Sequence, residues 1–286
     1  MISLIVASWD RVREPERLLK SLDNQTYRNF EVILADQNDD HRLDVLVEAY
    51  PRLKIKHLRL ERGLSKARNA ALRFAQGNLI AFPDDDCWYP PELLAKVVAW
   101  FEEHPEFAVL LTATRDQMGH LMSPKFPPKQ GARTKTSVLR CVVTFNAFLN
   151  AEAVQAVGCF REDIGPGTSS RYQSGEDIDY LVRPVECGFP TWYEPDLTVY
   201  HPNFKDPERL LRKTYTYALG LGHVLRCHNY PWWVIGEAIA RAVCGVAVYL
   251  CRFDFKMAKV YALRTKGLLE GYFETRSSPR ANQYAG

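Results

Sequence analysis

The sequence predicts an α/β fold, a mixed and mainly parallel sheet flanked by helices, with a C-terminal helical appendage. The chain has 286 residues, enough for one large domain with a sizeable core. Over residues 1–110 short apolar runs alternate with helical patterns, the order of stacked βα units, and from Pro207 to about Glu274 the pattern is helical. Apolar residues make up 47% and charged residues 25%, which excludes a disordered, collagen-like or coiled-coil chain.

Residues 1–110 contain four predicted strands, each followed by a predicted helix. The first helix carries Pro15 near its start, where a missing N–H costs little. The strands are expected at residues 2–7, 30–35, 53–58 and 79–82, and the helices at 14–22, 43–50, 65–75 and 91–101.

The second half of the chain is less regular. A loop at residues 123–136 is rich in Pro, Lys and Gly, and a loop at 165–175 is built from Gly, Pro, Thr and Ser, a type that suits the gating of a site. We expect strands at 138–148 and 197–201, helices at 151–157 and 176–188, and a tail that Pro231 divides into two helical segments.

The formal net charge is +3 and is unevenly distributed. From His201 onward 13 Lys and Arg stand against 6 Asp and Glu, so the tail is basic. The small total argues against a nucleic-acid binder with a broad basic surface. Seven scattered cysteines form no CxxC pair and no basic segment precedes the first apolar run, so we expect a cytoplasmic protein with reduced thiols.

Acidic residues follow three of the predicted strands. Asp10 comes after the first strand, Asp36 after the second, and residues 84–86 are three aspartates after the fourth. Ligands of an open parallel sheet bind beyond the carboxyl ends of its strands, so we expect these acids at one mouth. Acids also serve ordinary turns by bonding their own backbone, and this alternative stays open for each position alone.

The run LIAFPDDDCW is the most informative of these segments. Two carboxylates one residue apart at a strand end bind a divalent ion through oxygen, and Mg²⁺ or Mn²⁺ fits best. Substrate phosphates commonly complete the coordination of such ions, which indicates a diphosphate. The sequence has no GxGxxG and no GxxxxGK[ST] motif, so neither a dinucleotide fold nor a P-loop is supported. A solvated surface turn is the alternative.

Two strand-end segments resemble those of the family 2 glycosyltransferases, inverting enzymes with a GT-A fold that transfer a sugar from a nucleotide diphosphate. The first is IVASWDR, in which Ser8, Trp9 and Asp10 stand where Thr, Tyr and Asn are usual. The second is ILADQNDD, in which Asp36 matches a base-binding aspartate and Gln37 replaces a usual Asp. The resemblance implies that Ser8, Trp9, Asp10 and Asp36 contact the nucleotide sugar.

The helix and the acidic turn that follow match the same family. GLSKARNAAL resembles the helix behind the nucleotide, which implies a donor contact for Arg68. The metal motif is matched by FPDDDCWYPPELL, in which Cys87 replaces a frequent fourth acid. The resemblance implies that Asp84 and Asp85 bind the nucleotide sugar and that Asp86 binds the metal.

Two later blocks extend the resemblance to about residues 1–203. NAFLNAEAVQAVGCFRED is similar to the acceptor-side segment, and SGEDIDYLVRPVECGF to the ED motif at the start of a helix. The family's general base is usually the second acid of the pair, which implies Asp177, with Glu176 as the alternative. Acids at this place also serve the helix dipole alone. His201, in LTVYHP, stands where many relatives hold the metal or the diphosphate, and a strand-end cap is its alternative.

The resemblance implies a one-step inverting transfer. The acceptor hydroxyl attacks the anomeric carbon opposite the leaving diphosphate, Asp177 removes its proton, and a metal on Asp86 offsets the charge of the diphosphate. The implied domains are a GT-A domain over residues 1–206, with a nucleotide-sugar half at 1–110 and an acceptor half at 111–206, and a helical tail at 207–286.

The tail lies outside the resemblance and includes an apolar stretch of almost membrane-span length, residues 232–251. Glu237 and Arg241 interrupt the stretch, and charges are costly in hydrocarbon, so a peripheral position at an anionic membrane surface is favoured over a span. Aromatic residues at one end and cations on both sides suit this interface. Helices packed on the main domain are the alternative.

The sequence therefore predicts a metal-dependent inverting glycosyltransferase in polysaccharide or glycolipid assembly. Its expected partners are a nucleotide-diphosphate sugar donor and a saccharide or lipid-linked saccharide acceptor, met at the cytoplasmic face of the membrane. A non-catalytic nucleotide-sugar-binding or scaffold protein on the same fold is the alternative, although it would be expected to lose the acids that this chain keeps. A nucleotidyltransferase would be expected to have a glycine-rich phosphate loop where this chain has SWDRVREPE.

Overall fold

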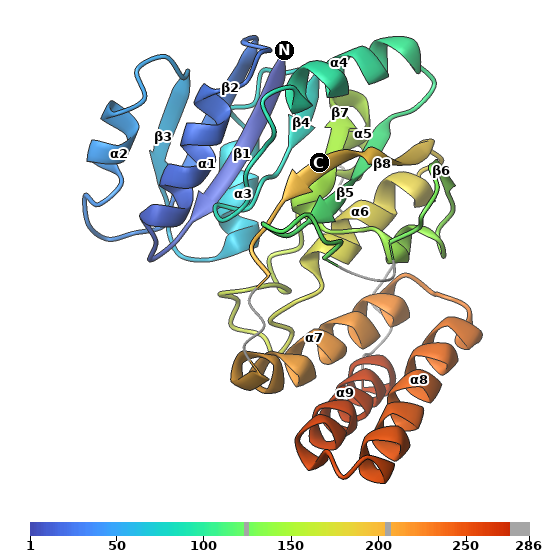
Figure 1. The fold of residues 1–286 in the computed structure, drawn as a ribbon. Coiled ribbons are helices and arrows are strands. Elements are labelled where there is room, and N and C mark those ends of the chain that lie inside the picture. Colours follow the sequence, from blue (N-terminus) through green and yellow to red (C-terminus); the bar gives the residue numbers. More distant parts are fainter. Residues whose placement is uncertain (123–125, 204–206, 275–286) are drawn as a thin grey trace. The chain divides into compact units, whose positions relative to one another are not determined.

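The computed structural model describes residues 1–122, 126–203 and 207–274 (Figure 1). The chain divides into two compact units. The first contains Met1–Phe160 and Tyr180–Asn203, and the second contains Arg161–Asp179 and the C-terminal helices. Part of the predicted loop at 123–136, residues 123–125, lies outside the described residues.

The first unit is built on one eight-stranded sheet with the order β3-β2-β1-β4-β7-β5-β8-β6. The pairs β1/β2, β2/β3, β1/β4 and β5/β8 are parallel, whereas β7 runs antiparallel to β4 and β5, and β6 runs antiparallel to β8. The predicted mixed, mainly parallel sheet is confirmed. The strands are β1 (Ile2–Ser8), β2 (Phe30–Asp36), β3 (Ile55–Arg59), β4 (Leu79–Ala81), β5 (Val109–Arg115), β6 (Gly131–Arg133), β7 (Ala147–Asn150) and β8 (Thr191–Tyr200).

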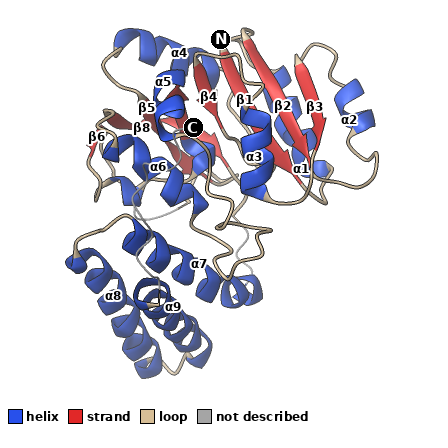
Figure 2. Cartoon of the chain, turned by 180° about the vertical axis from the view of Figure 1, so that it is seen from behind, coloured by secondary structure: helices blue, strands red, loops and turns tan. Residues whose placement is uncertain are grey.

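Helices cover both faces of the sheet, as Figures 1 and 2 show from opposite sides. On one face α1 (Arg13–Asp23) and α4 (Leu93–Glu103) bury their apolar sides, and on the other lie α3 (Leu64–Leu72) and α5 (Ala151–Val157). The helix α2 (Asp44–Glu48) lies near the β3 edge. Strand residues alternate between the two faces, so β1 and β2, which are buried on both, read as nearly continuous apolar runs.

The segment predicted as a strand at 138–148 is mostly not a strand. It forms two 3₁₀ turns, η1 (Val138–Arg140) and η2 (Thr144–Asn146), before β7 begins. The buried Asn146 fixes this path, because its side-chain amide donates to the carbonyls of Thr112 (2.6 Å) and Cys141 (2.9 Å). The apolar residues of the segment 138–148 are buried in these turns. An apolar run without periodicity does not distinguish a buried turn from a strand.

Two strands, β5 and β6, were not predicted, and β8 begins six residues earlier than predicted. Between β5 and β8 the register shifts at Thr112 and Ala113, where residues 195–197 of β8 have no partner on β5. Such a bulge interrupts the regular alternation of side chains and hides the strand in the sequence.

The second unit contains three long helices, α7 (Pro207–Cys227), α8 (Trp232–Cys251) and α9 (Phe255–Phe273). The sequence predicted two helical segments here instead of three, because the turn at residues 252–254 carries no Pro or Gly to mark the break between α8 and α9. Phe253 adopts a positive φ of 56° there, and the Asp254 carboxylate caps α9 by accepting from the Met257 N–H (3.0 Å). The helices α7 and α9 pack closely at Gly271, where a Cβ would lie 2.1 Å from the Leu219 carbonyl oxygen.

The first acids of α6 (Glu176–Glu186) belong to the second unit and the rest of this helix to the first. Its N-terminus follows Gly175, whose φ of 104° is costly for a residue with a Cβ. The buried Asp179 receives a contact from His228 Nε2 at 3.0 Å, so the start of α6 is bound to the residue that follows α7.

Candidate functional site

The three aspartates that follow β4 form a turn at the carboxyl edge of the sheet. Asp84 makes a parallel bridge with Ala7 of β1, and Trp88 makes an antiparallel bridge with Tyr200 of β8. The turn is therefore held between the ends of β1 and β8. The strand order changes direction between β1 and β4, and such a switch point is where open α/β sheets bind ligands.

Each carboxylate of the turn has a defined partner. Arg68, on α3 and 1% exposed, donates to Asp84 Oδ1 at 2.9 Å. The Ser8 hydroxyl, at the end of β1, donates to Asp85 Oδ2 at 2.7 Å. Arg11 Nη1 donates to both Asp85 Oδ1 (2.6 Å) and Asp86 Oδ2 (2.8 Å).

His201 follows β8 and reaches the same turn. Its Nε2 lies 2.9 Å from Asp86 Oδ1, and its Nδ1 lies 2.9 Å from the carbonyl oxygen of Pro202. A carbonyl only accepts, so Nδ1 carries a proton and Nε2 is the nitrogen directed at the acids. The ring also stacks on Phe145, with centroids 4.8 Å apart, which fixes its plane.

These contacts control the charges of the turn. Burial would by itself raise the pKa of Asp86, but the hydrogen bonds and charges of His201 and Arg11 lower it to about 2. Burial likewise opposes the protonation of His201, yet Asp86 raises the pKa of the imidazole above its ordinary value. Asp85 differs, since burial raises its pKa despite the opposing effects of Arg11 and Ser8.

Asp84, Asp86 and His201 have the geometry of a metal site. One ligand atom from each can be chosen so that the three lie within 4.8 Å of one another. Carboxylate oxygens suit Mg²⁺ and Mn²⁺, and a histidine whose other nitrogen donates to a backbone carbonyl is oriented as metal-bound histidines are. The residues present therefore fit the divalent ion that the sequence predicts.

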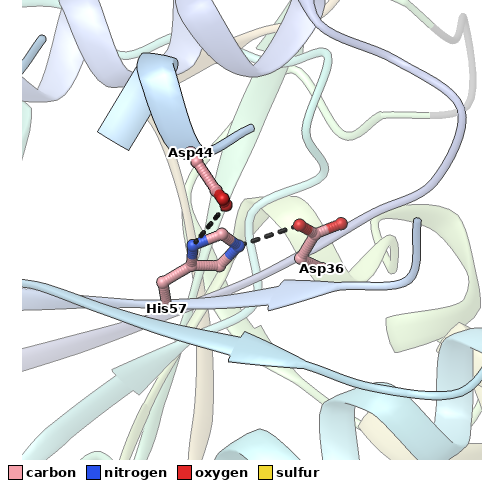
Figure 3. Close-up of side chains that lie close together, drawn as sticks. All are labelled: Asp36, Asp44 and His57. Atoms are coloured by element: carbon pink, nitrogen blue, oxygen red, sulfur yellow. Dashed lines mark hydrogen bonds and ion pairs between the residues drawn. The ribbon is translucent and has the colours of Figure 1, made fainter. Parts of the chain in front are cut away.

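A second cluster surrounds Asp36 at the end of β2 (Figure 3). His57 of β3 lies between two carboxylates, with Nε2 at 2.8 Å from Asp36 Oδ2 and Nδ1 at 3.6 Å from Asp44 Oδ1. Asp36 Oδ1 accepts from both the backbone and the side-chain amide of Asn38. Since Asp36 is fully buried, direct contact with a nucleotide base requires a neighbour such as Asn38 or His57 to move.

Trp9 and Asp10 lie in the exposed turn after β1. Trp9 is 45% exposed, and the guanidinium carbon of Arg62 lies 3.7 Å from the centre of its ring. Asp10 has a φ of 56°, and its carboxylate accepts from Arg42 at 2.7 Å. The turn thus presents an aromatic face and a carboxylate near the ends of β1 and β2.

Glu176 and Asp177 lie in the first turn of α6, in the second unit. Glu176 is buried against Gly165, whose φ is 101°, and Asp177 is half-buried. A helix N-terminus favours negative charge at these positions. The assignment of Asp177 as the general base, with Glu176 as the alternative, stays a prediction.

The sequence predicted that Asp10, Asp36 and the three aspartates of the turn share one edge of the sheet, and the first unit shows them there. The prediction missed Arg11 and His57. Arg11 occupies an irregular loop, where no periodicity indicates the direction of a side chain. His57 carried a signal, because it is a histidine in a predicted strand next to the strand that ends in Asp36.

Sequence comparison agrees with this geometry. Glycosyl transferase family 2 matches residues 3–158, more than half of the chain. An uncharacterized glycosyltransferase of Haemophilus influenzae is 34% identical over 120 residues, 41% of this chain and 40% of its own length. WfgD of Escherichia coli, a UDP-Glc:alpha-D-GlcNAc-diphosphoundecaprenol beta-1,3-glucosyltransferase, is 30% identical over 110 residues, 37% of this chain and 44% of its own length.

The fold is that of solved GT-A glycosyltransferases. Residues 1–349 of Staphylococcus aureus TarS in complex with UDP-GlcNAc align with a TM-score of 0.61 and 16% identity, over 97% of this chain and 93% of that one. The mannosyltransferase PcManGT of Pyrobaculum calidifontis, in complex with GDP-Man and Mn²⁺, aligns with a TM-score of 0.66 and 16% identity, over 96% and 88%. The protein belongs to glycosyl transferase family 2.

Replacing Arg68 by Met tests how far the turn depends on its buried cation. We expect the free energy of unfolding in urea to fall by about 2–3 kcal/mol, because Asp84 loses the partner that compensates its partial burial. The matched control is Arg42→Met, which breaks an exposed pair with Asp10 and Asp40 and should change stability little. Equal stability losses in the two variants would show that the Arg68 contact has no special weight.

Proposed function

We propose that this chain transfers a sugar from a nucleotide-diphosphate donor to an acceptor hydroxyl with inversion at the anomeric carbon. The observation that carries the proposal is the convergence of Asp84, Asp86 and His201 at the switch point of the sheet. Membership of the family supports glycosyl transfer. The related folds in complex with UDP-GlcNAc and with GDP-Man support a nucleotide-sugar donor.

In this proposal Asp84, Asp86 and His201 hold one divalent ion. When bound, the ion supplies positive charge that offsets the negative charge growing on the leaving diphosphate. Carboxylates suit Mg²⁺ and Mn²⁺ alike, and the imidazole nitrogen favours Mn²⁺. The Mn²⁺ in the PcManGT complex supports this choice.

The donor contacts are proposed for residues around the same edge. Ser8 and Arg68 fix Asp85 and Asp84, and Trp9 offers its exposed ring to a base or a sugar. Asp10 and Asp36 lie at the ends of the neighbouring strands, where the family resemblance places nucleotide contacts.

Asp177 is proposed as the general base, with Glu176 as the alternative. A base that removes the acceptor proton during attack from the face opposite the diphosphate inverts the configuration in one step and needs no enzyme nucleophile. The half-buried position of Asp177 in the first turn of α6 supports this assignment, because a helix N-terminus favours negative charge.

The variant Asp177→Asn tests the base after the donor has been identified by thermal shift with UDP-, GDP- and dTDP-sugars in the presence of Mn²⁺. We expect turnover to fall by about 100-fold to 10,000-fold, because general-base assistance is lost, while the donor-induced shift remains. Glu176→Gln tests the alternative base: it should keep most of the turnover if Asp177 is the base, and lose it if Glu176 is. Near-normal turnover in Asp177→Asn removes this residue from the mechanism, and donor binding without any transfer by the wild type supports the scaffold alternative.

The second unit is proposed to rest on the cytoplasmic face of an anionic membrane, where the acceptor is a lipid-linked saccharide. Among the described residues α8 is long and apolar enough to span a bilayer, with a mean hydropathy of 1.8 over 18 residues of which 11% are buried. A groove of about 630 Å³ between α8 and α9 is lined largely by apolar side chains, including Val243, Val246 and Leu250. The exposed pair of Glu237 and Arg241 favours a peripheral position over a span.

The turn between α8 and α9 is the best-defined membrane contact. Phe253 and Phe255 are 81% and 67% exposed, and Arg252, Lys256 and Lys259 lie exposed beside them. Exposed aromatic rings flanked by cations match an acyl-chain boundary beneath anionic head groups. The diphosphoundecaprenol acceptor in the name of WfgD supports a lipid-linked acceptor here.

Replacing both Phe253 and Phe255 by Ser tests this contact in co-sedimentation with liposomes that contain anionic lipid, at low salt. We expect affinity to fall by at least about 100-fold, because each aromatic side chain would contribute about 1.5–3 kcal/mol once it is buried in the bilayer. Met118→Ser, which removes an exposed apolar side chain from the first unit, should bind as the wild type does. Unchanged binding of the double variant, or a wild type that stays in solution, contradicts the membrane proposal.

A further inference from the structure

Arg11 lies where a cation is expected at the acidic turn. It belongs to the short loop between β1 and α1, and one of its nitrogens, Nη1, donates to both Asp85 and Asp86. Arg11 thus bridges two carboxylates of the turn through a single nitrogen. The contact is therefore a cation held between two of the acids, in the manner of a bound ion.

Two guanidinium groups balance two of the three carboxylate charges of the turn. Arg68 pairs with Asp84, Arg11 pairs with Asp85 and Asp86, and His201 faces the second oxygen of Asp86. Both oxygens of Asp86 are thus engaged by cationic or proton-donating groups. A divalent ion at Asp86 would add two charges to a turn that already holds two guanidinium groups, and it would meet Arg11 beside the same carboxylate.

Arg17 of α1 also lies at the turn, but its contacts differ from those of Arg11. Arg17 Nη2 donates to the backbone carbonyl of Asp86 at 2.5 Å, and its guanidinium lies 4.4 Å from the centre of the Trp88 ring. It therefore fixes the backbone of the turn and leaves the carboxylates to Arg11. The Arg11 side chain is also 34% exposed, so it has a path toward solvent.

We propose that Arg11 is an internal counter-cation that competes with the divalent metal for Asp86 and so sets how tightly the metal binds. The metal then binds weakly to the protein alone and more tightly when a diphosphate is present, since a diphosphate offers the guanidinium another anionic partner. This inference rests on the proposed metal site. It assigns Arg11 a positioning role, acting through Asp85 and Asp86.

The variant Arg11→Gln tests the competition with Mn²⁺ as the only ligand, followed by the electron paramagnetic resonance of free Mn²⁺ at low salt. We expect Mn²⁺ to bind about tenfold more tightly than to the wild type, because a competing positive charge within hydrogen-bonding distance is removed. The metal-free variant should also melt at a lower temperature, since two buried carboxylates lose a partner. Should Arg11→Gln fail to fold, Arg11→Lys serves instead. Its affinity for Mn²⁺ is expected to lie between that of the wild type and the tenfold higher affinity expected for Arg11→Gln.

The matched control is Arg52→Gln, which removes the same charge from an ion pair with Asp23, near the start of β2 and away from the turn. It should bind Mn²⁺ as the wild type does. Equal affinities in Arg11→Gln and the wild type, including no binding by either, overturn the proposal, and weaker binding by Arg11→Gln shows that Arg11 supports the metal. No sugar nucleotide is used, so a chain that binds Mn²⁺ as expected but transfers no sugar contradicts the proposed function alone.

Discussion

Charge compensation around three consecutive aspartates is the constraint on which the carboxyl edge of the sheet depends. Adjacent carboxylates that are largely buried are stable only when opposite charges and donors meet them. Their partners come from three distant parts of the chain: Arg11 before α1, Arg68 on α3 and His201 after β8. The contacts of these partners with the aspartates therefore join the ends of β1, β4 and β8. The elements that form the site are also the elements that stabilise it.

The same contacts connect stability with chemistry. The groups that compensate Asp84 and Asp86 in the protein alone are those that an ion and a diphosphate would meet in the proposed reaction. His201 illustrates this, because the bond from its Nδ1 to a backbone carbonyl leaves Nε2 directed at Asp86, the orientation that a metal-binding histidine would need. The site is thus oriented before any ligand arrives, which lowers the cost of binding.

Much of the first unit could be predicted from the sequence, because alternating apolar runs and helical patterns fix the order of β1 to α4, and acids at strand ends of a parallel sheet must share an edge. The prediction was wrong where tertiary contacts override local pattern. Asn146 turns an apolar segment into 3₁₀ turns, and a bulge conceals much of β8. Arg11 and His57 were missed because loop geometry and strand pairing, which residue spacing does not encode, bring them to their partners.

The anomalous scattering of Mn²⁺ in crystals of the protein with a nucleoside diphosphate tests most directly whether the turn after β4 holds the metal. Two clusters of described side chains in the first unit offer comparable ligands, so the position of the peak distinguishes them. We expect one peak bounded by Asp84, Asp86 and His201, with the diphosphate beside it. A peak at Asp36, Asp44 and His57 instead, or a bound nucleotide remote from the turn after β4, would contradict it.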